Sequence, residues 1–331
     1  MANDNFNFGE GVSTGLTPMS SSIEPTNPSF RDLSTGSLTS QNVKVGTRSI
    51  LLRAGDNLDF AIKNLPSTGG TIYLASGTHY LTTNITIPAG VKITGDSESG
   101  SVVNFGGKNI GLIVGGNDVS LDNITLTNSI GSAVSATGYD NMVVTNISVT
   151  SCNIGFNYDT VTQMTFENIV ITTPTTIGFK FTACGGGMSN FAITSPGTYG
   201  IQLINCTAGI AISQWVITTS ASGGIIISGS SSLSFINGAI ISPTGIGIEL
   251  SATNNGINID NIVISGATSD AIKFTATTDR SWVRDCTIIG SGGYGINIAT
   301  ATCDDNHIID NYYASNTSGN LNDLGVGTIV R

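Results

Sequence analysis

Short apolar stretches recur along the chain, and small or polar residues separate them. Within one repeat Ile248 and Leu250 alternate with polar neighbours, and Ile262 and Ile264 do the same. Alternation with a period of two residues is typical of strands, whereas amphipathic helices show a spacing near 3.6. Each repeat therefore predicts three short strands joined by three turns.

Two markers share one period of about 23 residues. A glycine stands before one apolar stretch in each repeat, with Ala271 in one of the expected places: Gly131, Gly155, Gly178, Gly200, Gly224, Gly247, Ala271 and Gly295. An amide or acid follows at a second fixed place: Asn123, Asn146, Asn168, Asn190, Gln214, Asn237, Asn261, Asp285 and Asn311. A fixed period of this length predicts a solenoid.

A repeat of three strands and three turns makes one turn of a right-handed parallel β-helix, with successive turns about 4.8 Å apart. Nine such turns predict an all-β rod on the order of 45 Å long. The recurrent Asn falls at the bend between the second and third strands, where Asn tolerates the left-handed backbone conformation. Stacked amides can donate and accept along the rod, so the ladder is interpreted as structural.

The two ends of the chain differ from the middle. Residues 1–47 are rich in Ser, Thr, Pro and Gly without a period, which predicts an extended arm suited to anchoring or assembly. A single β-helix domain is expected over residues 48–331, with regular coils from about residue 111. Residues 56–65 predict a capping helix in which Asp56 caps and Leu58, Ala61, Ile62 and Leu65 share a face.

The motifs "GGTIYLASGTHYL" and "ITIPAGVKITG", together with this helix and the later Asn coils, resemble the pectate-lyase-like superfamily over roughly residues 48–331. That resemblance implies a right-handed parallel β-helix whose end is closed by the helix. The superfamily includes lyases, hydrolases, phage tailspikes and inactive surface rods, so it does not by itself imply an activity. The last stretch, "NTSGNLNDLGVGTIVR", resembles the ending of phage tailspikes and other virion β-helices.

Composition narrows the classes of partner. Lys plus Arg number 12 and the net charge is −10, so the sequence lacks the basic stripe of a nucleic-acid binder. No apolar run is long enough to span a membrane, and the first residues do not resemble a signal peptide. We therefore expect synthesis in the cytoplasm without a signal peptide, and a location on a virion or extracellular particle. The five cysteines show no zinc-site spacing, and stacked Cys184 and Cys206 are expected to stay reduced. No cofactor or metal is expected.

Candidate catalytic and binding residues lie on the outer face of the first strand of each repeat. The residues two places after the marker are Ala133, Asn157, Lys180, Gln202, Ile226, Glu249, Lys273 and Asn297. The polar members of this column form a candidate outer binding face: Asn157, Lys180, Gln202, Glu249, Lys273 and Asn297. Glu249 and Lys273 are expected to form an exposed ion pair. On the second strand Asp260, Arg284 and Asp310 predict a charge ladder, and Asp122 and Glu167 are expected two turns, about 9.6 Å, apart.

The residues to mutate, if the protein is an enzyme, are Glu249, Asp159, Asp304, Asp305 and His307. The last three lie in "CDDNHIIDN", which also reads as an ordinary turn. Three functions remain open. The first is a non-enzymatic structural β-helix of a virion or other particle, anchored through its arm to other structural proteins, with further copies of itself as candidate partners in a trimer or by lateral packing. The second is a polysaccharide lyase or glycoside hydrolase acting on acidic polysaccharide, and the third is a non-cleaving module that binds surface glycan.

Overall fold

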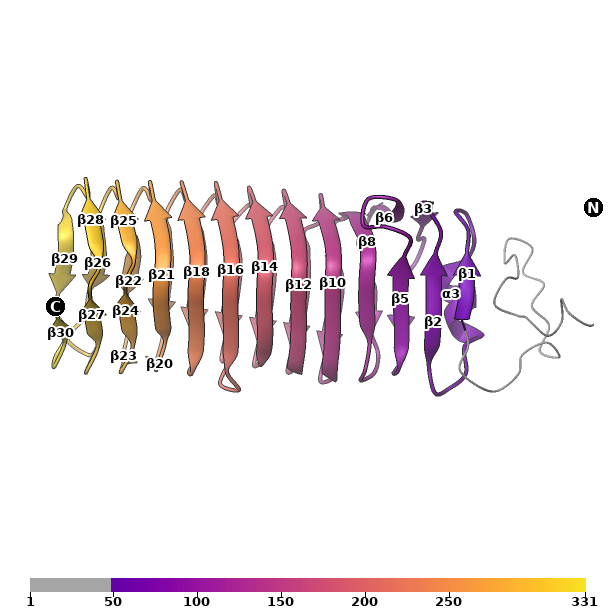
Figure 1. Ribbon diagram of the computed structural model, residues 1–331, viewed down its shortest axis with the longest axis horizontal. Coiled ribbons are helices and arrows are strands. Elements are labelled where there is room, and N and C mark those ends of the chain that lie inside the picture. The colour runs from indigo at the N-terminus through magenta and orange to yellow at the C-terminus, as the bar shows by residue number, and fades with distance from the viewer. Residues whose placement is uncertain (1–48) are drawn as a thin grey trace, which may run out of the picture.

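The computed structural model describes residues 49–331, and the arm expected over residues 1–47 lies outside the described residues. The described chain winds into one continuous rod of stacked turns (Figure 1). Two parallel sheets, here called sheet A and sheet B, form its walls. The right-handed parallel β-helix predicted from the repeat is therefore confirmed.

Sheet A has seventeen strands: β1 (Ser49–Leu52), β2 (Gly70–Leu74), β3 (Gly77–Tyr80), β5 (Val91–Gly95), β6 (Ser101–Lys108), β8 (Ser120–Ser129), β10 (Asp140–Thr150), β12 (Thr162–Thr172), β14 (Gly186–Thr194), β16 (Ile210–Thr218), β18 (Leu233–Ile241), β21 (Asn258–Ser265), β24 (Trp282–Arg284), β25 (Thr287–Ile289), β27 (His307–Ile309), β28 (Tyr312–Ala314) and β30 (Ile329–Val330). Sheet B has eleven: β4 (Ile85–Ile87), β7 (Leu112–Val114), β9 (Ser132–Thr137), β11 (Ile154–Asp159), β13 (Ile177–Thr182), β15 (Tyr199–Ile204), β17 (Gly223–Ser228), β19 (Ile246–Ser251), β22 (Ile272–Phe274), β26 (Tyr294–Ile298) and β29 (Gly319–Asp323). A short pair, β20 (Asn254–Asn255) and β23 (Thr278–Asp279), lies at one corner.

The rod is longer than nine turns. Eleven strands stack in sheet B, which at the usual spacing spans about 48 Å. The two additional strands of sheet B are β4, before the ladder of Asn residues begins in β8, and β29, after its last step. The estimate from the sequence is short because these two end turns do not carry the Asn marker.

The second and third predicted strands of each repeat form one long bent strand in sheet A, as in β8, β10, β12, β14, β16 and β18. The bend falls at the ladder residue, whose φ lies between 51° and 56° at Asn123, Asn146, Asn168, Asn190, Gln214, Asn237, Asn261 and Asp285. One left-handed residue turns the strand without ending its pairing, because the register resumes at the next residue. The last step of the ladder was assigned wrongly: Arg284 pairs with Ile309, so Asp310, with φ 54°, occupies the position and Asn311 follows it.

The first glycine marker was also misplaced. Ile154 pairs with Ser132, so Ala133 stands opposite Gly155 and Ser135 opposite Asn157. Ala133 is therefore buried and does not belong to the outward column. The marker column begins at Gly111, which stands opposite Ala133. A Cβ at Gly155 would meet the carbonyl oxygen of Gly178 at 2.6 Å, which explains the preference for glycine in this column.

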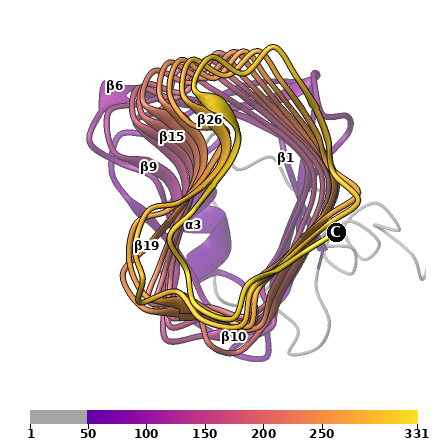
Figure 2. The same cartoon turned by 90° about the vertical axis from the view of Figure 1, so that its left-hand side faces the viewer.

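The interior is a continuous stack of buried aliphatic and aromatic side chains, enclosed by the walls that Figure 2 shows end-on. Phe166 is fully buried and lies 5.1 Å from Phe156 and 5.3 Å from Phe179 between ring centroids. Edge and offset contacts of this kind add to the stabilisation from burial. The core is continuous from turn to turn, because each strand repeats the inward positions of its neighbour.

Helix α3 (Leu58–Lys63) lies across the N-terminal end of the coil (Figures 1 and 2). Leu58, Ala61 and Ile62 are buried against the first turns, as the sequence predicts. The cap is Asn57 instead of Asp56: the Asn57 side chain accepts from the Phe60 amide at 3.0 Å. Asp56 accepts from the Arg53 amide at 2.7 Å and so belongs to the preceding turn.

Candidate functional site on the outer faces of the coil

The outer face of sheet B carries a column of polar side chains in register. The pairing joins Asn157 to Lys180, Lys180 to Gln202, and then Ile226, Glu249 and Lys273 in turn. These side chains are half-buried, so the outward column expected from the sequence exists. Asn297 continues the register but is only 9 % exposed, so its place on an open binding face is wrong.

A second outward column on sheet B carries aromatic rings over glycines. The Tyr199 ring leans along the rod over Gly223, where a Cβ would lie 2.9 Å from its Cε1 atom. Tyr294 lies in the same way over Gly319, with Cε1 3.6 Å from the position of a Cβ. Burial, with the nearby Glu249 carboxylate, raises the pKa of Tyr199. The Tyr199 ring is therefore a neutral aromatic surface beside a carboxylate, with Lys180 and Gln202 on the adjacent column.

The expected ion pair between Lys273 and Glu249 does not form, and Lys273 lies beside Asp270 instead. Its Nζ atom lies 3.6 Å from Oδ2 of Asp270, which is 5 % exposed. The same Asp270 oxygen accepts from Asn297 Nδ2 at 2.8 Å, and the other accepts from the Tyr294 amide at 2.7 Å. A buried carboxylate needs such partners more than an exposed one does, which explains why Lys273 pairs with Asp270 and not with Glu249.

The candidate carboxylates of an enzyme do not converge. Asp159 and Glu249 are separated by four turns, about 19 Å along the rod. Asp304 and Asp305 lie in the turn between β26 and β27, where Asp305 has φ 51°. The separation of about 19 Å between Asp159 and Glu249 exceeds the roughly 5–10 Å between the carboxyl groups of a glycosidase pair. Within residues 49–331 no three potential ligands are grouped to hold a metal ion.

His307 stacks on Trp282 of the preceding turn with ring centroids 3.9 Å apart and planes 5° from parallel. Both side chains point outward from sheet A, and Trp282 is 38 % exposed. The pair stands apart from Glu249 on a different wall of the coil. The geometry therefore gives His307 a packing contact and no acid-base partner among the described residues.

Asp122 is the best-connected acid on the outer face of sheet A. Its Oδ1 atom accepts from Thr145 Oγ1 at 2.9 Å and from Asn146 Nδ2 at 3.0 Å, and its Oδ2 atom lies 3.4 Å from Lys92 Nζ. Burial acts to raise the pKa of Asp122, but the hydrogen bonds from Asn146 and Thr145 and the charge of Lys92 together lower it. Glu167 lies two turns away in the same column and is exposed. A carboxyl held ionised in this way is suited to structural pairing and is a poor proton donor.

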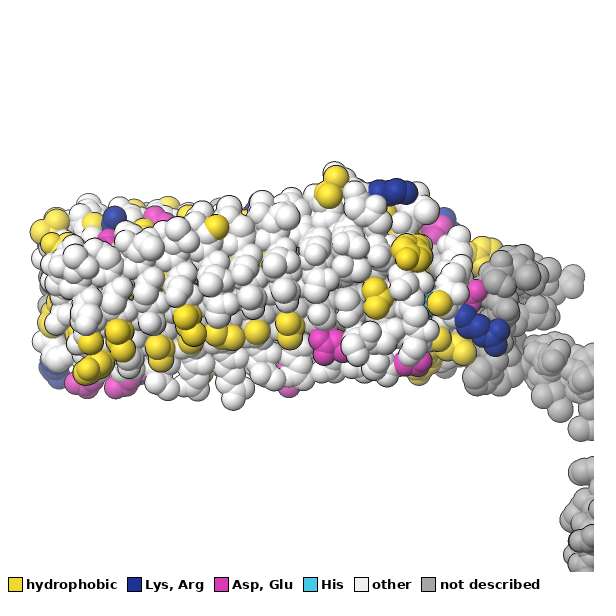
Figure 3. Space-filling view, turned by 90° about the horizontal axis from the view of Figure 1, so that it is seen from above, with side chains coloured by type: hydrophobic (Ala, Val, Ile, Leu, Met, Phe, Trp, Pro, Cys, Tyr) yellow, Lys and Arg dark blue, Asp and Glu magenta, His cyan; other side chains and the backbone are white. Residues whose placement is uncertain are grey.

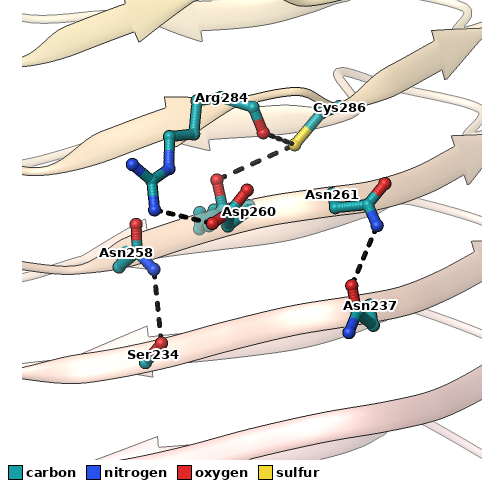
Figure 4. A network of polar contacts seen from close by, with 8 residues as sticks. Ser234, Asn237, Asn258, Asp260, Asn261, Arg284 and Cys286 are labelled. Atoms are coloured by element: carbon teal, nitrogen blue, oxygen red, sulfur yellow. Dashed lines mark hydrogen bonds and ion pairs between the residues drawn. The ribbon is translucent and has the colours of Figure 1, made fainter.

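The charge ladder predicted on sheet A for Asp260, Arg284 and Asp310 has two members instead of three. Arg284 Nη2 donates to Asp260 Oδ2 at 2.7 Å across one turn (Figure 4). Ile309 occupies the next place in that column, so Asp310 does not extend it. The predicted three-residue charge ladder is therefore one ion pair.

The Asn ladder lies at the outer bend and is half-exposed or exposed along its length. Asn168 donates to Asn146 at 2.9 Å, Asn190 donates to Asn168, and Asn261 donates to Asn237 at 2.8 Å (Figure 4). The first amide of the chain of bonds, Asn146, donates to Asp122 instead of Asn123. The ladder is therefore external and holds neighbouring turns together in segments.

All five cysteines are free and buried in the structure, and the reduced state of Cys184 and Cys206 stays a prediction. Burial raises the pKa of Cys184 to about 12. Four of the thiols also donate to a backbone carbonyl of their own turn, as Cys184 does to Thr182 at 3.2 Å, and Cys303 donates to Ala276 of the turn before at 3.1 Å. These thiols are packing groups inside the coil.

Sequence reasoning missed three features. Tyr199 over Gly223 could have been found from the pairing of an aromatic residue with a glycine one period later. Asp270 stands in a column otherwise made of Ile, Tyr, Gly and one Ser, so an acid there was a signal of a buried partner network. The last turn carries three asparagines five residues apart whose amides bond to the backbone of the turn before: Asn306, Asn311 and Asn316.

Comparison with known proteins agrees with this architecture. Residues 163–313 match the family model described as a right handed beta helix region. The A-module of the Azotobacter vinelandii mannuronan C-5 epimerase AlgE6 is similar, with 14 % identity, 82 % of this chain and 93 % of that chain covered, and a TM-score of 0.58. The catalytic domain of a GH87 alpha-1,3-glucanase in complex with tetrasaccharides is similar at 12 % identity, 88 % and 68 % coverage, and a TM-score of 0.59.

A viral protein, ORF18 of Geobacillus virus E2, shares the fold at 14 % identity and a TM-score of 0.51. The match covers 79 % of this chain and 54 % of that chain, so this chain spans about half the length of the viral protein. No curated protein sequence matches. The chain thus has the right-handed parallel β-helix fold, which an epimerase module, a glucanase catalytic domain and a viral protein share. In the described part of the chain no helix is long and apolar enough to cross a membrane.

Proposed function

We propose that this protein is a non-enzymatic structural rod of a virion or another particle surface. The observation that carries the proposal is the uniform coil: from β9 to β26 each turn repeats the same strand register around an unbroken apolar core. A stack in which every turn is hydrogen-bonded to two neighbours along its whole perimeter is stiff along its axis. Stiffness over this length serves projection or scaffolding.

Two further features support a particle. The segment over residues 1–47 has the composition of an extended arm and would anchor the rod to other structural proteins. The similarity to a Geobacillus virus E2 protein supports a virion setting, on the ground of fold alone.

Immunogold labelling of particles from the source, with antibodies raised against the coil of residues 49–331, tests this role. We expect label on the particles from wild-type cells and its loss when residues 1–47 are deleted, while circular dichroism of the truncated protein still reports a folded coil. Label confined to the soluble fraction, or a truncated protein that still assembles, would refute the proposal. Release of reducing sugar or of an unsaturated product from acidic polysaccharides would instead identify an enzyme.

A glycan-binding face is the second candidate, because Tyr199 offers an aromatic surface flanked by groups that hydrogen-bond sugar hydroxyls. Its ring lies over Gly223, and Glu249, Gln202 and Lys180 stand on the adjacent column. A sugar ring can place its C–H face on such an aromatic surface while its hydroxyls meet the polar column. Sheet B would then bind a glycan without cleaving it.

Isothermal titration with a panel of neutral and uronic-acid oligosaccharides tests this face. We expect Tyr199→Ala to weaken any measured binding at least about tenfold. Tyr73→Ala is the matched control, since Tyr73 is an exposed tyrosine on sheet A. Equal loss in both variants, or none in Tyr199→Ala, would remove sheet B as the binding surface.

A further inference from the structure

One outer wall of the rod is uncharged over most of its length. It is formed by the segments that follow the ladder bend in seven successive turns, here called the neutral face: residues 123–129, 146–151, 168–174, 190–196, 214–220, 237–243 and 261–267. None of these segments contains Asp, Glu, Lys, Arg or His, although the chain has a net charge of −10.

The centre of the neutral face is apolar. The outward column reads Val170, Ala192, Val216, Ala239 and Val263 in register. Val170, Val263 and neighbouring Ile241 are each 41 % exposed. Figure 3 shows such a row of hydrophobic side chains running along the rod beside uncharged surface. Strand positions that face water usually carry polar side chains, so a partner is indicated.

We propose that the neutral face binds a second copy of this chain. Two bodies of the same net charge repel, and they approach most easily through the surface that carries no charge. Cores of protein interfaces are depleted of charged residues in the same way. A foreign partner of opposite charge would find nothing to bind on this wall, whereas an identical uncharged wall matches it.

The size of the face fits a dimer. Seven turns of about 4.8 Å and five residues of about 3.3 Å give a footprint of about 550 Å², or about 1,100 Å² for the pair. Specific interfaces begin at roughly 1,000 Å² in total. Two flat sheet walls also pack face to face at about 10 Å, as in a β-sandwich.

The relief of the face suggests how the copies are arranged. A groove of about 510 Å³ runs beside the column at its N-terminal end, lined by Asn168, Val170, Ala192, Gln214, Val216 and, at its end, Glu98. Val170 and Val263 lie two turns on either side of Val216. A two-fold axis that crosses the rods at Val216 therefore sets Val263 of each copy against the groove of the other, with the rods antiparallel. Such an isologous contact closes on itself as a dimer.

Sedimentation and light scattering of the full chain test the proposal. At about 100 µM we expect a mass of twice 34.0 kDa, with Val263→Asp weakening association at least about tenfold. Ile226→Asp is the matched control, because Ile226 is a half-buried β-branched residue facing outward from sheet B. Circular dichroism checks that both variants are folded. A wild-type mass of 34.0 kDa, or equal dimerisation in Val263→Asp, would overturn the proposal.

Oxidative cross-linking tests the arrangement. Because the five native thiols are buried, Val216→Cys adds one reactive thiol at the predicted axis. We expect oxidation to link this variant into covalent dimers and to leave Ile226→Cys monomeric in denaturing gels. A dimer in solution without a cross-link at Val216, or a mass of three chains, would overturn the two-fold arrangement.

Discussion

The ladder bend makes a prediction in which glycine should stabilise the fold better than alanine does. Asn146 has φ 54°, donates to Asp122 at 3.0 Å and accepts from Asn168 at 2.9 Å. Its replacement by Gly removes two half-exposed hydrogen bonds, each worth about 0.5–1 kcal/mol net, so Asn146→Gly should cost about 1–2 kcal/mol. Asn146→Ala loses the same bonds and adds about 1–2 kcal/mol for a Cβ in the left-handed region, for a total near 2–4 kcal/mol.

The control is Asn258, a strand residue without positive φ that donates to Ser234 at 3.3 Å (Figure 4). There the order should reverse, because glycine loses about 0.5–1 kcal/mol relative to alanine in the middle of a strand. Urea denaturation followed by circular dichroism gives the free energy of unfolding of all four variants. If Asn146→Ala is as stable as Asn146→Gly, the left-handed bend is not what selects Asn in the ladder.

Three further predictions follow from the core, the thiols and the charged network. Phe166→Ala should lower the free energy of unfolding by about 3–5 kcal/mol in the same denaturation, because Phe166 is fully buried among other rings. The control Thr165→Ala, on the same strand, should cost little. A loss under about 1 kcal/mol in Phe166→Ala would mean that the coil collapses around the cavity. The five cysteines should be inert to a thiol reagent at pH 8 until denaturant is added, since burial raises the pKa of Cys184 to about 12; labelling of the native protein would contradict this burial. The lowered pKa of Asp122 contributes stability that is present above the ordinary pKa of 3.8 and is lost as the pH falls through the pKa of the folded state. Asp122→Asn should therefore be less stable at neutral pH and show a flatter fall of Tm at acid pH. An unchanged fall of Tm would show that other carboxyl groups govern the acid denaturation.

The candidate site could be predicted only in part. The outward column of Lys180, Gln202 and Glu249 follows from counting residues, because strand side chains alternate and each turn has nearly constant length. Which side chains bind one another did not follow. Lys273 is in register with Glu249 yet pairs with Asp270. A long side chain can reach several carboxyl groups, and the most buried of them gains most from the pairing.

The errors of register have a common cause. Ala133 and Asn311 were each assigned one or two places away from the residue that the pairing selects, in both cases at an end of the regular repeat. A period read from the sequence averages over turns of 22–24 residues. Only backbone pairing between neighbouring turns decides where an extra or missing residue is absorbed.

By itself the sequence determined the solenoid, its apolar interior and the left-handed bend, because each depends on a local pattern that recurs in every repeat, and the handedness followed from the general crossover preference. The tertiary structure decided the rest: that the Asn ladder lies outside, that Tyr199 covers Gly223, and that seven uncharged segments line up as one wall. These features join residues a full turn apart, and their contacts depend on the stacking geometry of the coil instead of on any one repeat.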